Sequence, residues 1–418
     1  MQTYVKATYR IETPHPLEHA VAILAGEQSS GTFIRVPGET DELRERHSAR
    51  VERITELDVV ATPSLPGSQA PRGSGTPQYR RAEIEIAFPL ANMGPSLPNL
   101  LATVAGNLYE LRELSGVRLI DLELPEAFAA AYAGPQFGIP GTRRLAGVKG
   151  RPIIGTIIKP SVGLSPAQTA ALVRTLALAG LDFIKDDELM ANPPHSPLAE
   201  RVAAVMRVIN EVAEQTGRKV MYAFNITDEI DAMLSHHDTV EAAGGTCVMV
   251  SVNSVGLPGV AYLRRHSRLP IHGHRNGWGM LTRAPQLGIA FRAYQQFWRL
   301  AGIDHLHTNG LRNKFCESDE SVVDSVRACL TPLFGGYQVM PVLSSGQWAG
   351  QAPDTYARVG SIDLMYLCGG GIMAHPAGVA AGVASVRQGW EAALAGVSIE
   401  AYAATHPELQ QAIEVYGR

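Results

Sequence analysis

Short apolar runs recur through the second part of the chain, and each is followed by a segment with a helical pattern. Eight such runs lie in RPIIGTIIK, LDFIKDDE, KVMYAFNIT, GTCVMVSV, LPIHGHR, DHLHT, YQVMPVLSSG and IDLMYLCGGG. Strands that alternate with helices favour a parallel sheet, and eight of them favour a closed barrel. The pattern therefore predicts an α/β fold, with a (β/α)8 TIM barrel and C-terminal helices over residues 151–418.

The first part of the chain has a different pattern. Strand-like runs, YVKATYRIE, RAEIEIAFPL and VRLIDLELP, alternate with helical stretches, and turn formers fill residues 67–78. This predicts a smaller N-terminal α+β domain over residues 1–132. The Gly- and Pro-rich passage that follows has neither a helical nor a strand period, so residues 133–150 are predicted to connect the two domains.

Local signals mark where two barrel helices begin. Ser165 with Pro166 next to it and Gln168 after it has the pattern of a capping box. Ser196 and Pro197 repeat the Ser-Pro start. These helix starts indicate where the preceding strands end.

Composition narrows the range of partners. Of the 418 residues 45% are hydrophobic, and 36 Lys and Arg against 40 Asp and Glu give a net charge of −4. This balance predicts no binding to nucleic acid or to an anionic membrane, and no apolar stretch has the length of a membrane span. The four cysteines lack CxxC spacing, which favours a soluble, cytoplasmic protein without disulfides or a thiolate zinc cluster.

Nearly every predicted barrel strand ends in polar side chains or in glycines. Barrels of this kind form their active sites at the C-terminal ends of the strands, so these residues are candidates for function. In chain order they are Lys159, Lys185, Asp187, Glu188, Asn225, His274, Arg275, His305, His307, Ser344, Ser345, Gly346, Gly369, Gly370 and Gly371.

The run from Lys185 to Glu188 is the most informative strand end. Because side chains alternate along a strand, Lys185 and Asp187 share a face, and Glu188 can turn toward it where the strand ends. Two carboxylates suit Mg²⁺, whereas a protonated lysine between them opposes a cation. A lysine carbamylated by CO2 is an anionic oxygen ligand instead. The alternative is a salt bridge that closes the barrel mouth.

Anion binding is the second chemistry that the strand ends indicate. Gly346 and the glycines at 369–371 follow the seventh and eighth strands, where barrels commonly bind phosphate through backbone N–H groups. Arg275 and His307 stand at other strand ends and are candidates for a second anion. The alternatives are a glycine turn without a ligand and ordinary structural hydrogen bonding by the two side chains.

Taken in order, these strand ends resemble those of the RuBisCO large-subunit family. The resemblance implies that Lys159 of TIIKPSVGLS shuttles protons. It implies that Lys185 of GLDFIKDDE, as a carbamate, binds Mg²⁺ with Asp187 and Glu188. The motifs HGHR, DHLHTNGLRNK, SSG and CGGG supply the residues expected to contact substrate or move its protons, which are His274, Arg275, His307, Lys314, Ser344, Gly346, Gly369 and Gly370.

The resemblance extends to the N-terminal domain. In GEQSSGTF and AGNLYE, Glu27, Thr32 and Asn107 match residues that RuBisCO donates across its dimer interface. This implies a homodimer with two shared active sites, either alone or within an assembly of dimers.

Three departures from RuBisCO argue against efficient CO2 fixation. Ser161 stands where RuBisCO has a second lysine, Trp278 where it has a histidine, and Phe33 where it has a tryptophan. The stretch ELMANPPHSPL is instead similar to RuBisCO-like proteins. The resemblance therefore implies a Mg²⁺-dependent enzyme that forms an enolate from a phosphorylated keto-sugar or 3-oxo sugar acid.

Lys314 favours one reaction among those of the RuBisCO-like proteins. It lies seven residues after His307, the spacing of a mobile-loop lysine in RuBisCO. A cation held over the metal suits a carboxylate, which predicts decarboxylation or C–C cleavage of a β-keto acid phosphate of the 3-oxo-isoapionate-4-phosphate type. If Lys314 only binds phosphate or caps its loop, a keto-sugar-phosphate enolase or isomerase of the methionine-salvage type is the alternative.

Two functions of other classes are also weighed. The pairs His272/His274 and His305/His307 are reminiscent of binuclear zinc hydrolases, although those proteins carry such a pair on the first strand. A catalytically retired binding or regulatory protein is the last alternative, and the retained metal-binding run argues against it.

Overall fold

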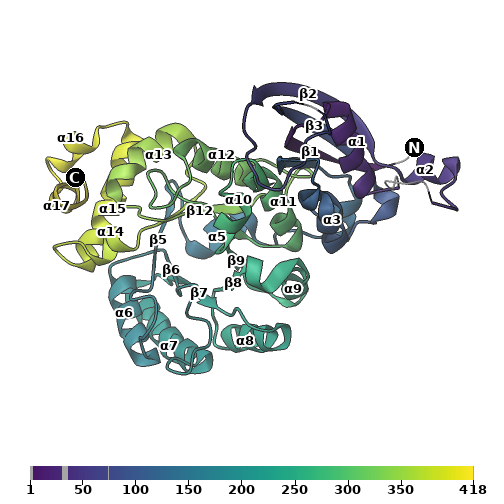
Figure 1. Cartoon of the computed structure of the whole chain (residues 1–418). Helices are drawn as coiled ribbons and strands as arrows, with labels where there is room; N and C mark the ends of the chain where they lie inside the picture. Colours follow the sequence, from purple (N-terminus) through teal and green to yellow (C-terminus); the bar gives the residue numbers. More distant parts are fainter. Residues whose placement is uncertain (1–2, 31–35, 74, 418) are drawn as a thin grey trace. The chain divides into compact units, whose positions relative to one another are not determined.

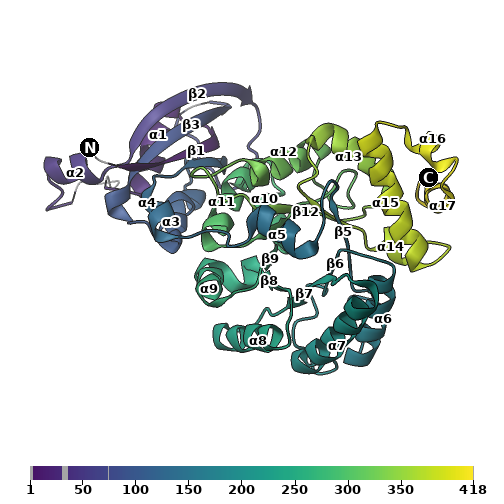
Figure 2. The ribbon, with the colours of Figure 1, turned by 180° about the vertical axis from the view of Figure 1, so that it is seen from behind.

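The computed structural model describes residues 3–30, 36–73 and 75–417. The chain forms two compact units (Figures 1 and 2). The first unit contains Met1–Ala133 and Gly277–Leu300, and the second contains Gly134–Asn276 and Ala301–Arg418. The first unit is thus built from two separate stretches, one of which is inserted between barrel strands.

The first unit is organised around a five-stranded sheet with the order β10-β4-β1-β3-β2. Its strands are β1 (Tyr4–Thr13), β2 (Arg50–Val60), β3 (Tyr79–Pro89), β4 (Gly116–Glu123) and β10 (Leu287–Ile289). β1 pairs antiparallel with both β3 and β4, and β10 joins β4 in parallel. Every second residue from Val5 to Ile11 is buried, as expected for a strand with one face on a core.

Helices and short 3-10 turns complete the first unit. They are α1 (Leu17–Glu27), α2 (Asp41–His47), η1 (Leu90–Asn92), α3 (Leu97–Val104), η2 (Asn107–Glu110), α4 (Ala127–Ala131), α10 (Trp278–Thr282) and α11 (Phe291–Ala301). α1 packs beside the sheet (Figure 1).

Strand β2 has no counterpart among the strand-like runs of the sequence. It lies at the edge of the sheet, and almost all of its residues are exposed. An edge strand that carries charged side chains and buries neither face shows no alternation of apolar positions. Its place was decided by pairing with β3 rather than by a hydrophobic pattern.

The second unit confirms the predicted barrel. Eight parallel strands close in the order β11-β12-β13-β5-β6-β7-β8-β9. They are β5 (Ile153–Ile157), β6 (Phe183–Lys185), β7 (Met221–Asn225), β8 (Cys247–Ser251), β9 (Ile271–His274), β11 (His305–His307), β12 (Met340–Leu343) and β13 (Met365–Leu367). Each lies within one of the eight apolar runs.

Helices follow the barrel strands on the outside (Figures 1 and 2). They are α6 (Pro166–Leu178), α7 (Leu198–Thr216), α8 (Ile230–Ala242), α9 (Val252–His266), α12 (Asp319–Leu330), η3 (Ala349–Gln351), α13 (Ala352–Val359), α14 (Gly370–Met373) and α15 (Val379–Ala395). The chain ends with α16 (Ile399–Ala403) and α17 (Pro407–Tyr416), and α17 packs against α15.

One predicted helix start is confirmed and the other is corrected. Ser165 accepts a hydrogen bond from the Gln168 N–H, and Gln168 bonds back to the Ser165 N–H, which completes the capping box. Ser196 is not a cap, because α7 begins after Pro197. The Asn192 side chain accepts from the first helical N–H, that of Leu198, while the Ser196 hydroxyl accepts from the buried Arg201 at 3.3 Å.

The barrel interior contains a buried apolar cluster formed by side chains from the six neighbouring strands β12, β13, β5, β6, β7 and β8. Residues between 133 and 150 include α5 (Gly138–Ala146), whose Ile139 belongs to the same buried cluster. The other buried members are Val148, Ile153, Phe183, Met221, Ala223, Cys247, Met249, Met340, Val342, Met365 and Leu367. The barrel is therefore a packed core, which leaves the strand ends for chemistry. Over the part of the chain that the structure covers, no helix combines the length and apolar character needed to cross a membrane.

Candidate active site

The end of β6 places a lysine and two carboxylates together. Lys185 is 1% exposed, and its Nζ lies 3.5 Å from Glu188 Oε2 and donates to the Asp186 carbonyl at 2.9 Å. Asp187 is 2% exposed. Because β6 is only three residues long, all of these groups lie at or just beyond the carboxyl end of one strand.

A second lysine reaches the same group from the neighbouring strand. β5 pairs with β6, and Lys159, just after β5, places its Nζ 2.7 Å from Asp187 Oδ2. The same Nζ donates to Ser161 at 2.7 Å. Lys159 and the run from Lys185 to Glu188, which the sequence indicated at two different strand ends, are thus brought together.

Burial alters the acid–base behaviour of Lys185. Loss of solvation lowers the pKa of its amine, and the nearby carboxylates only partly offset this effect. A lowered pKa increases the fraction of neutral amine, which is the form that reacts with CO2. A buried lysine beside two carboxylates therefore fits both an ion pair and, after carbamylation, a set of oxygen ligands for Mg²⁺.

His274 joins this group from the end of β9. Its Nε2 lies 3.5 Å from Glu188 Oε2, and burial, with the charge of Lys185, lowers the pKa of His274 to about 4. At neutral pH the imidazole is therefore uncharged and can accept a proton. Its ring also lies 4.4 Å, centroid to centroid, from that of His307.

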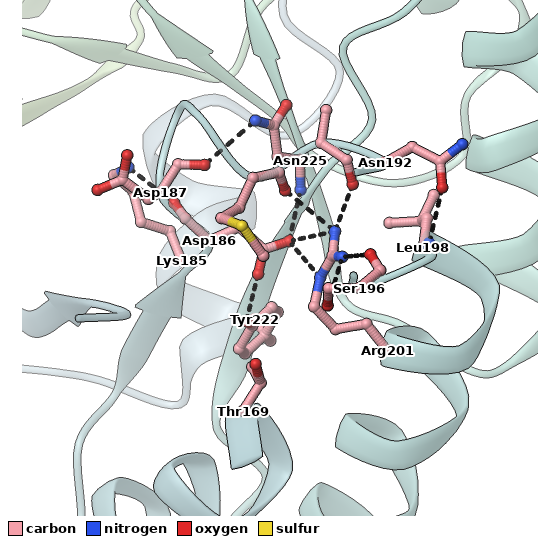
Figure 3. A network of polar contacts seen from close by, with 12 residues as sticks. Thr169, Lys185, Asp186, Asp187, Asn192, Ser196, Leu198, Arg201, Tyr222 and Asn225 are labelled. Carbon is pink, nitrogen blue, oxygen red and sulfur yellow. Dashed lines mark hydrogen bonds and ion pairs between the residues drawn. The ribbon is translucent and has the colours of Figure 1, made fainter. Parts of the chain in front are cut away.

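Asp186 lies in the middle of the run from Lys185 to Glu188, but its side chain points away from the other carboxylates. Figure 3 shows its carboxylate directed toward Arg201 and Tyr222, away from Asp187. One oxygen accepts from the Tyr222 hydroxyl at 2.6 Å, and the other accepts from the Asn225 N–H at 3.0 Å and from Arg201 at 3.3 Å. The alternation of the strand predicts this opposite direction, but the sequence analysis assigned no role to Asp186.

Arg201 connects the run from Lys185 to Glu188 with the loop that follows it. The side chain is fully buried in the first turn of α7 and forms an ion pair with Asp186. It also donates to the carbonyls of Met190, Ala191 and Ser196, the last of which is labelled in Figure 3. Asn225 adds a second tie, because its side chain donates to the carbonyls of Asp187 and Glu188 at 3.2 and 3.1 Å.

Arg275 is engaged by a carboxylate of the loop after β11. Its Nη2 lies 3.0 Å from Glu317 Oε2, and the arginine is 5% exposed. Glu317 also accepts from Asn309 at 2.6 Å and from Ser321 at 2.9 Å. An anion that binds Arg275 therefore has to share it with, or displace, Glu317, a residue that the sequence analysis did not single out.

Lys314 lies on the same loop with an exposed side chain. Its backbone N–H donates to the Ser345 carbonyl at 3.2 Å, which holds the loop against the end of β12. The Nζ sits 5.3 Å from the ring centroid of Phe315, next to it in the chain. This backbone bond places Lys314 beside the residues after β12, and none of its described contacts is with Lys185, Asp187 or Glu188.

The glycines after β13 are of two kinds. A Cβ on Gly371 would lie 2.5 Å from the Gln347 carbonyl oxygen, so packing requires that glycine. A Cβ on Gly369 or Gly370 would meet nothing within 4 Å, and neither has a positive φ. Packing therefore does not explain these two glycines. Gly346 differs again, because its φ of +90° itself favours glycine.

The other imidazoles of the two histidine pairs are already engaged. His272 faces His305 through Nδ1 at 3.2 Å and His307 through Nε2 at 2.8 Å. His307 also contacts Ser344, just after β12, through its other nitrogen at 3.2 Å. With both nitrogens of His272 and His307 occupied by protein groups, these rings lack the lone pairs that a binuclear zinc site needs.

Among the described residues, one group of His and Asp side chains on the outer helices is close enough to share a metal ion. Asp238 Oδ1 accepts from His237 Nδ1 at 3.1 Å and from His266 Nε2 at 2.6 Å. A metal at this Nδ1 would move the His237 proton to Nε2, which is buried without a hydrogen-bond partner. We therefore interpret the group as a hydrogen-bonded cluster.

The residues expected from the N-terminal domain lie in the first unit. Glu27 is the last residue of α1, and Asn107 begins η2. With its amide turned into the orientation that satisfies its neighbours, Gln28 accepts from the Asn107 N–H at 3.1 Å. Thr32 and Phe33 lie outside the described residues.

Comparison with protein families finds two adjoining matches. Residues 2–128 match the N-terminal domain of the ribulose bisphosphate carboxylase large chain, and residues 138–416 match its catalytic domain. A 3-oxo-isoapionate-4-phosphate transcarboxylase/hydrolase of Xanthobacter autotrophicus is 55% identical over 99% of both chains. A 3-oxo-isoapionate-4-phosphate decarboxylase of Rhizobium etli is 52% identical over 98% of both.

Solved structures agree with these matches. A RuBisCO-like protein of Burkholderia fungorum superimposes with a TM-score of 0.92 at 51% identity, covering 98% of this chain and 99% of the other. A dimeric archaeal RuBisCO of Hyperthermus butylicus superimposes with a TM-score of 0.84 at 27% identity, covering 99% and 96%.

Proposed function

The chain belongs to the ribulose bisphosphate carboxylase large-chain family, and we propose that it cleaves a phosphorylated 3-oxo sugar acid of the 3-oxo-isoapionate-4-phosphate type through an enolate. The observation that carries this proposal is the convergence of Lys159, Lys185, Asp187 and Glu188 at the ends of β5 and β6. Full-length relatives named for this substrate support the choice of substrate class.

Lys185, as its carbamate, Asp187 and Glu188 are the residues that would hold Mg²⁺. A bound Mg²⁺ supplies electrostatic stabilisation of negative charge that develops on substrate oxygens. Lys159 would move a proton at substrate carbon, and the 2.7 Å contact of its Nζ with Asp187 supports this role. His274, uncharged because of its lowered pKa, is placed to exchange protons with substrate hydroxyls.

The substrate is held by its phosphate and by its carboxylate in this proposal. Gly369 and Gly370 offer open backbone for the phosphate, with Gly346 beside the loop after β11. Arg275 is the candidate for a second anionic group, in competition with Glu317. Lys314 supplies a cation for the carboxylate that leaves or is transferred.

Carbamylation is tested by Mn²⁺ binding, which electron paramagnetic resonance can follow. We expect bicarbonate to strengthen Mn²⁺ binding by the wild type and to have no effect on Lys185→Arg, which keeps the cation but cannot form a carbamate. Lys149→Arg, at an exposed position, is the matched control and should behave as the wild type. A bicarbonate response that survives in Lys185→Arg, or in Lys185→Ala, contradicts this part of the proposal.

The reaction is tested with 3-oxo-isoapionate 4-phosphate itself. Release of CO2 identifies a decarboxylase, and release of a carboxylic acid fragment identifies hydrolysis or transfer. An enzyme that only exchanges the proton beside the carbonyl, or isomerises a keto-sugar phosphate, belongs to the enolase or isomerase alternative.

We further propose that the protein is cytoplasmic and a homodimer whose sites are shared between subunits. All four cysteines are unpaired, which fits a reducing compartment. A solved relative in the family is dimeric, and Glu27 and Asn107 lie in a different unit from the proposed metal ligands.

A further inference from the structure

Five side chains form a continuous line of contacts through the barrel interior. The line begins at Thr142 in α5 and ends at Ser344, just after β12. Thr142 Oγ1 lies 2.8 Å from His305 Nε2, and His305 Nδ1 lies 3.2 Å from His272 Nδ1. His272 Nε2 then lies 2.8 Å from His307 Nε2, and His307 Nδ1 lies 3.2 Å from Ser344 Oγ.

Each imidazole in this line carries one proton. Burial lowers the pKa of His305 to about 3 and holds the pKa values of His272 and His307 well below the usual range. A neutral imidazole has one N–H and one bare nitrogen, so it donates on one side and accepts on the other. The whole line must therefore run in one of two opposite directions.

The contact between Thr142 and its own helix decides the direction. Thr142 Oγ1 lies 2.5 Å from the Gly138 carbonyl oxygen, a separation that two oxygen atoms adopt only with a hydrogen between them. The carbonyl has no hydrogen, so the single hydroxyl proton of Thr142 is used here. Thr142 must then accept from His305, which is Nε2–H, and each following imidazole is fixed in turn.

We propose that Thr142, His305, His272 and His307 are positioning residues that fix the Ser344 hydroxyl as a donor into the barrel. In this arrangement Ser344 donates to His307 Nδ1, and its oxygen presents lone pairs toward the strand ends. Ser344 then accepts a hydrogen bond from a substrate hydroxyl and does not donate to a phosphate oxygen. The part of this inference that concerns substrate rests on the proposed function.

This line of contacts also changes the role expected of His307. Its Nε2–H is given to His272 and its Nδ1 accepts from Ser344, so it has no N–H for a phosphate. We infer that His307 orients Ser344, and that phosphate contacts come from the open glycines after β13. The substrate class that fits is one with a hydroxyl group near Ser344 and its phosphate near Gly369.

Imidazole tautomers give a direct test that requires no substrate. In full-length protein labelled with ¹⁵N-histidine, long-range ¹H–¹⁵N spectra distinguish Nδ1–H from Nε2–H, and single His→Gln variants assign the signals. We expect His305 and His307 as Nε2–H and His272 as Nδ1–H. The reverse direction requires the opposite tautomer at all three rings, so that pattern, or a mixture of the two, overturns the proposal.

Kinetics test whether the direction matters for the reaction. Thr142→Val removes the hydroxyl that sets the direction of the hydrogen bonds. We expect it to lower kcat about tenfold, with a smaller change in KM. Thr142→Ser retains the hydroxyl and should stay within about twofold of the wild type. Thr355→Val is the matched control, since Thr355 is equally buried and makes the same bond to the carbonyl four residues back, but lies outside the line.

The two arms separate this inference from the proposed function. A wild type that fails to turn over the sugar acid contradicts the proposed function, whereas the tautomers still decide the direction of the line. Equal losses of kcat in Thr142→Val and Thr355→Val, or a loss in Thr142→Ser as large as in Thr142→Val, would show that Thr142 acts only through packing. Either result overturns the positioning role.

Discussion

Burial sets the protonation of the individual side chains at this site. Lys185 and the imidazoles of His272, His305 and His307 are each less than 5% exposed. For an amine or an imidazole, loss of water disfavours the charged form, and the pKa values of all four are accordingly lowered. The site can therefore present neutral bases at a pH where exposed lysine is charged.

The buried histidines predict a loss of stability in mild acid. The pKa of His274 is about 4 and that of His305 about 3 in the folded protein, against about 6.5 in an unfolded chain. Below pH 6.5 these histidines bind protons in the unfolded chain but not in the folded protein. The stabilisation that the neutral histidines give is therefore complete above pH 6.5 and is lost as the pH falls toward their pKa values in the folded protein. The expected slope is about 1.4 kcal/mol per pH unit for each histidine.

Urea unfolding at several pH values between 7 and 4 measures this slope. His305→Gln removes one buried titrating group and should reduce the slope by the contribution of one proton. Thr355→Val, a buried substitution that removes no titrating group, is the control and should leave the slope nearly unchanged. Equal slopes in the wild type and His305→Gln would contradict the prediction.

Lys314 is expected to act mainly in the transition state. Its side chain is exposed on the loop after β11, and its backbone N–H bonds the Ser345 carbonyl just after β12. Lys314→Met keeps most of the bulk and removes the cation, and we expect kcat to fall by roughly 100-fold or more with a smaller change in KM. Deuterium uptake from solvent beside the carbonyl should survive better than bond cleavage.

The opposite kinetic pattern would assign Lys314 to phosphate binding. In that case KM rises and kcat stays nearly constant in Lys314→Met. Lys219→Met is the control and should change neither constant. Lys219 is exposed and donates to the carbonyl of Gly244, between α8 and β8.

At the scale of elements, the short strand β6 carries a buried carboxylate at each end. Asp182 precedes the strand and pairs with Arg151 and Arg218, and it accepts from the Ile154 N–H. Asp186 follows the strand and pairs with Arg201. Both stabilise the barrel, but only Asp186 is a neighbour in sequence of the proposed metal ligands, without being one itself.

Asp186→Asn and Asp182→Asn therefore form a matched pair of variants. Both should lower Tm, because Asp186→Asn leaves Arg201, and Asp182→Asn leaves Arg151 and Arg218, without a charge partner. Asp186→Asn should also weaken Mn²⁺ binding by about 10- to 100-fold, the usual scale for groups that orient metal ligands, whereas Asp182→Asn should leave it nearly unchanged. Tyr222→Phe removes only one hydrogen bond to Asp186 and replaces Asp186→Asn in this test if that variant does not fold. If metal affinity follows Tm alone in all three variants, the network has no orienting role.

At the scale of the whole molecule, a shared site predicts complementation between inactive variants. Mixing Glu27→Ala with Lys185→Ala gives heterodimers in which one site carries both changes and the other carries neither. Half of the dimers are then hybrids with half of their sites repaired, so about a quarter of the wild-type activity should return. Glu27→Ala mixed with Asn107→Ala is the control and should recover none, since every site then lacks one contribution from the small domain. No recovery in the first mixture after proven subunit exchange would place each site within one subunit.

Local patterns in the sequence determined the barrel and the candidate metal ligands at the end of one of its strands. The eight strands were recognisable because each is buried and therefore apolar, and Lys185, Asp187 and Glu188 were recognisable because neighbours on one strand end stay together in any fold that forms the strand. The Ser165 capping box was equally local, since all of its atoms lie within one turn of helix.

Tertiary structure alone decided what depends on partners far away in the chain. The position of the exposed edge strand β2 depends on its pairing with β3. The start of α7 depends on the bond from the Leu198 N–H to Asn192 and on the bonding of Ser196 to Arg201. The partner of Asp186 and the direction of the line from Thr142 to Ser344 likewise join elements that no spacing rule connects. The physical reason is that hydrogen bonding and desolvation are properties of the folded interior, where the nearest neighbour of a side chain is seldom its neighbour in sequence.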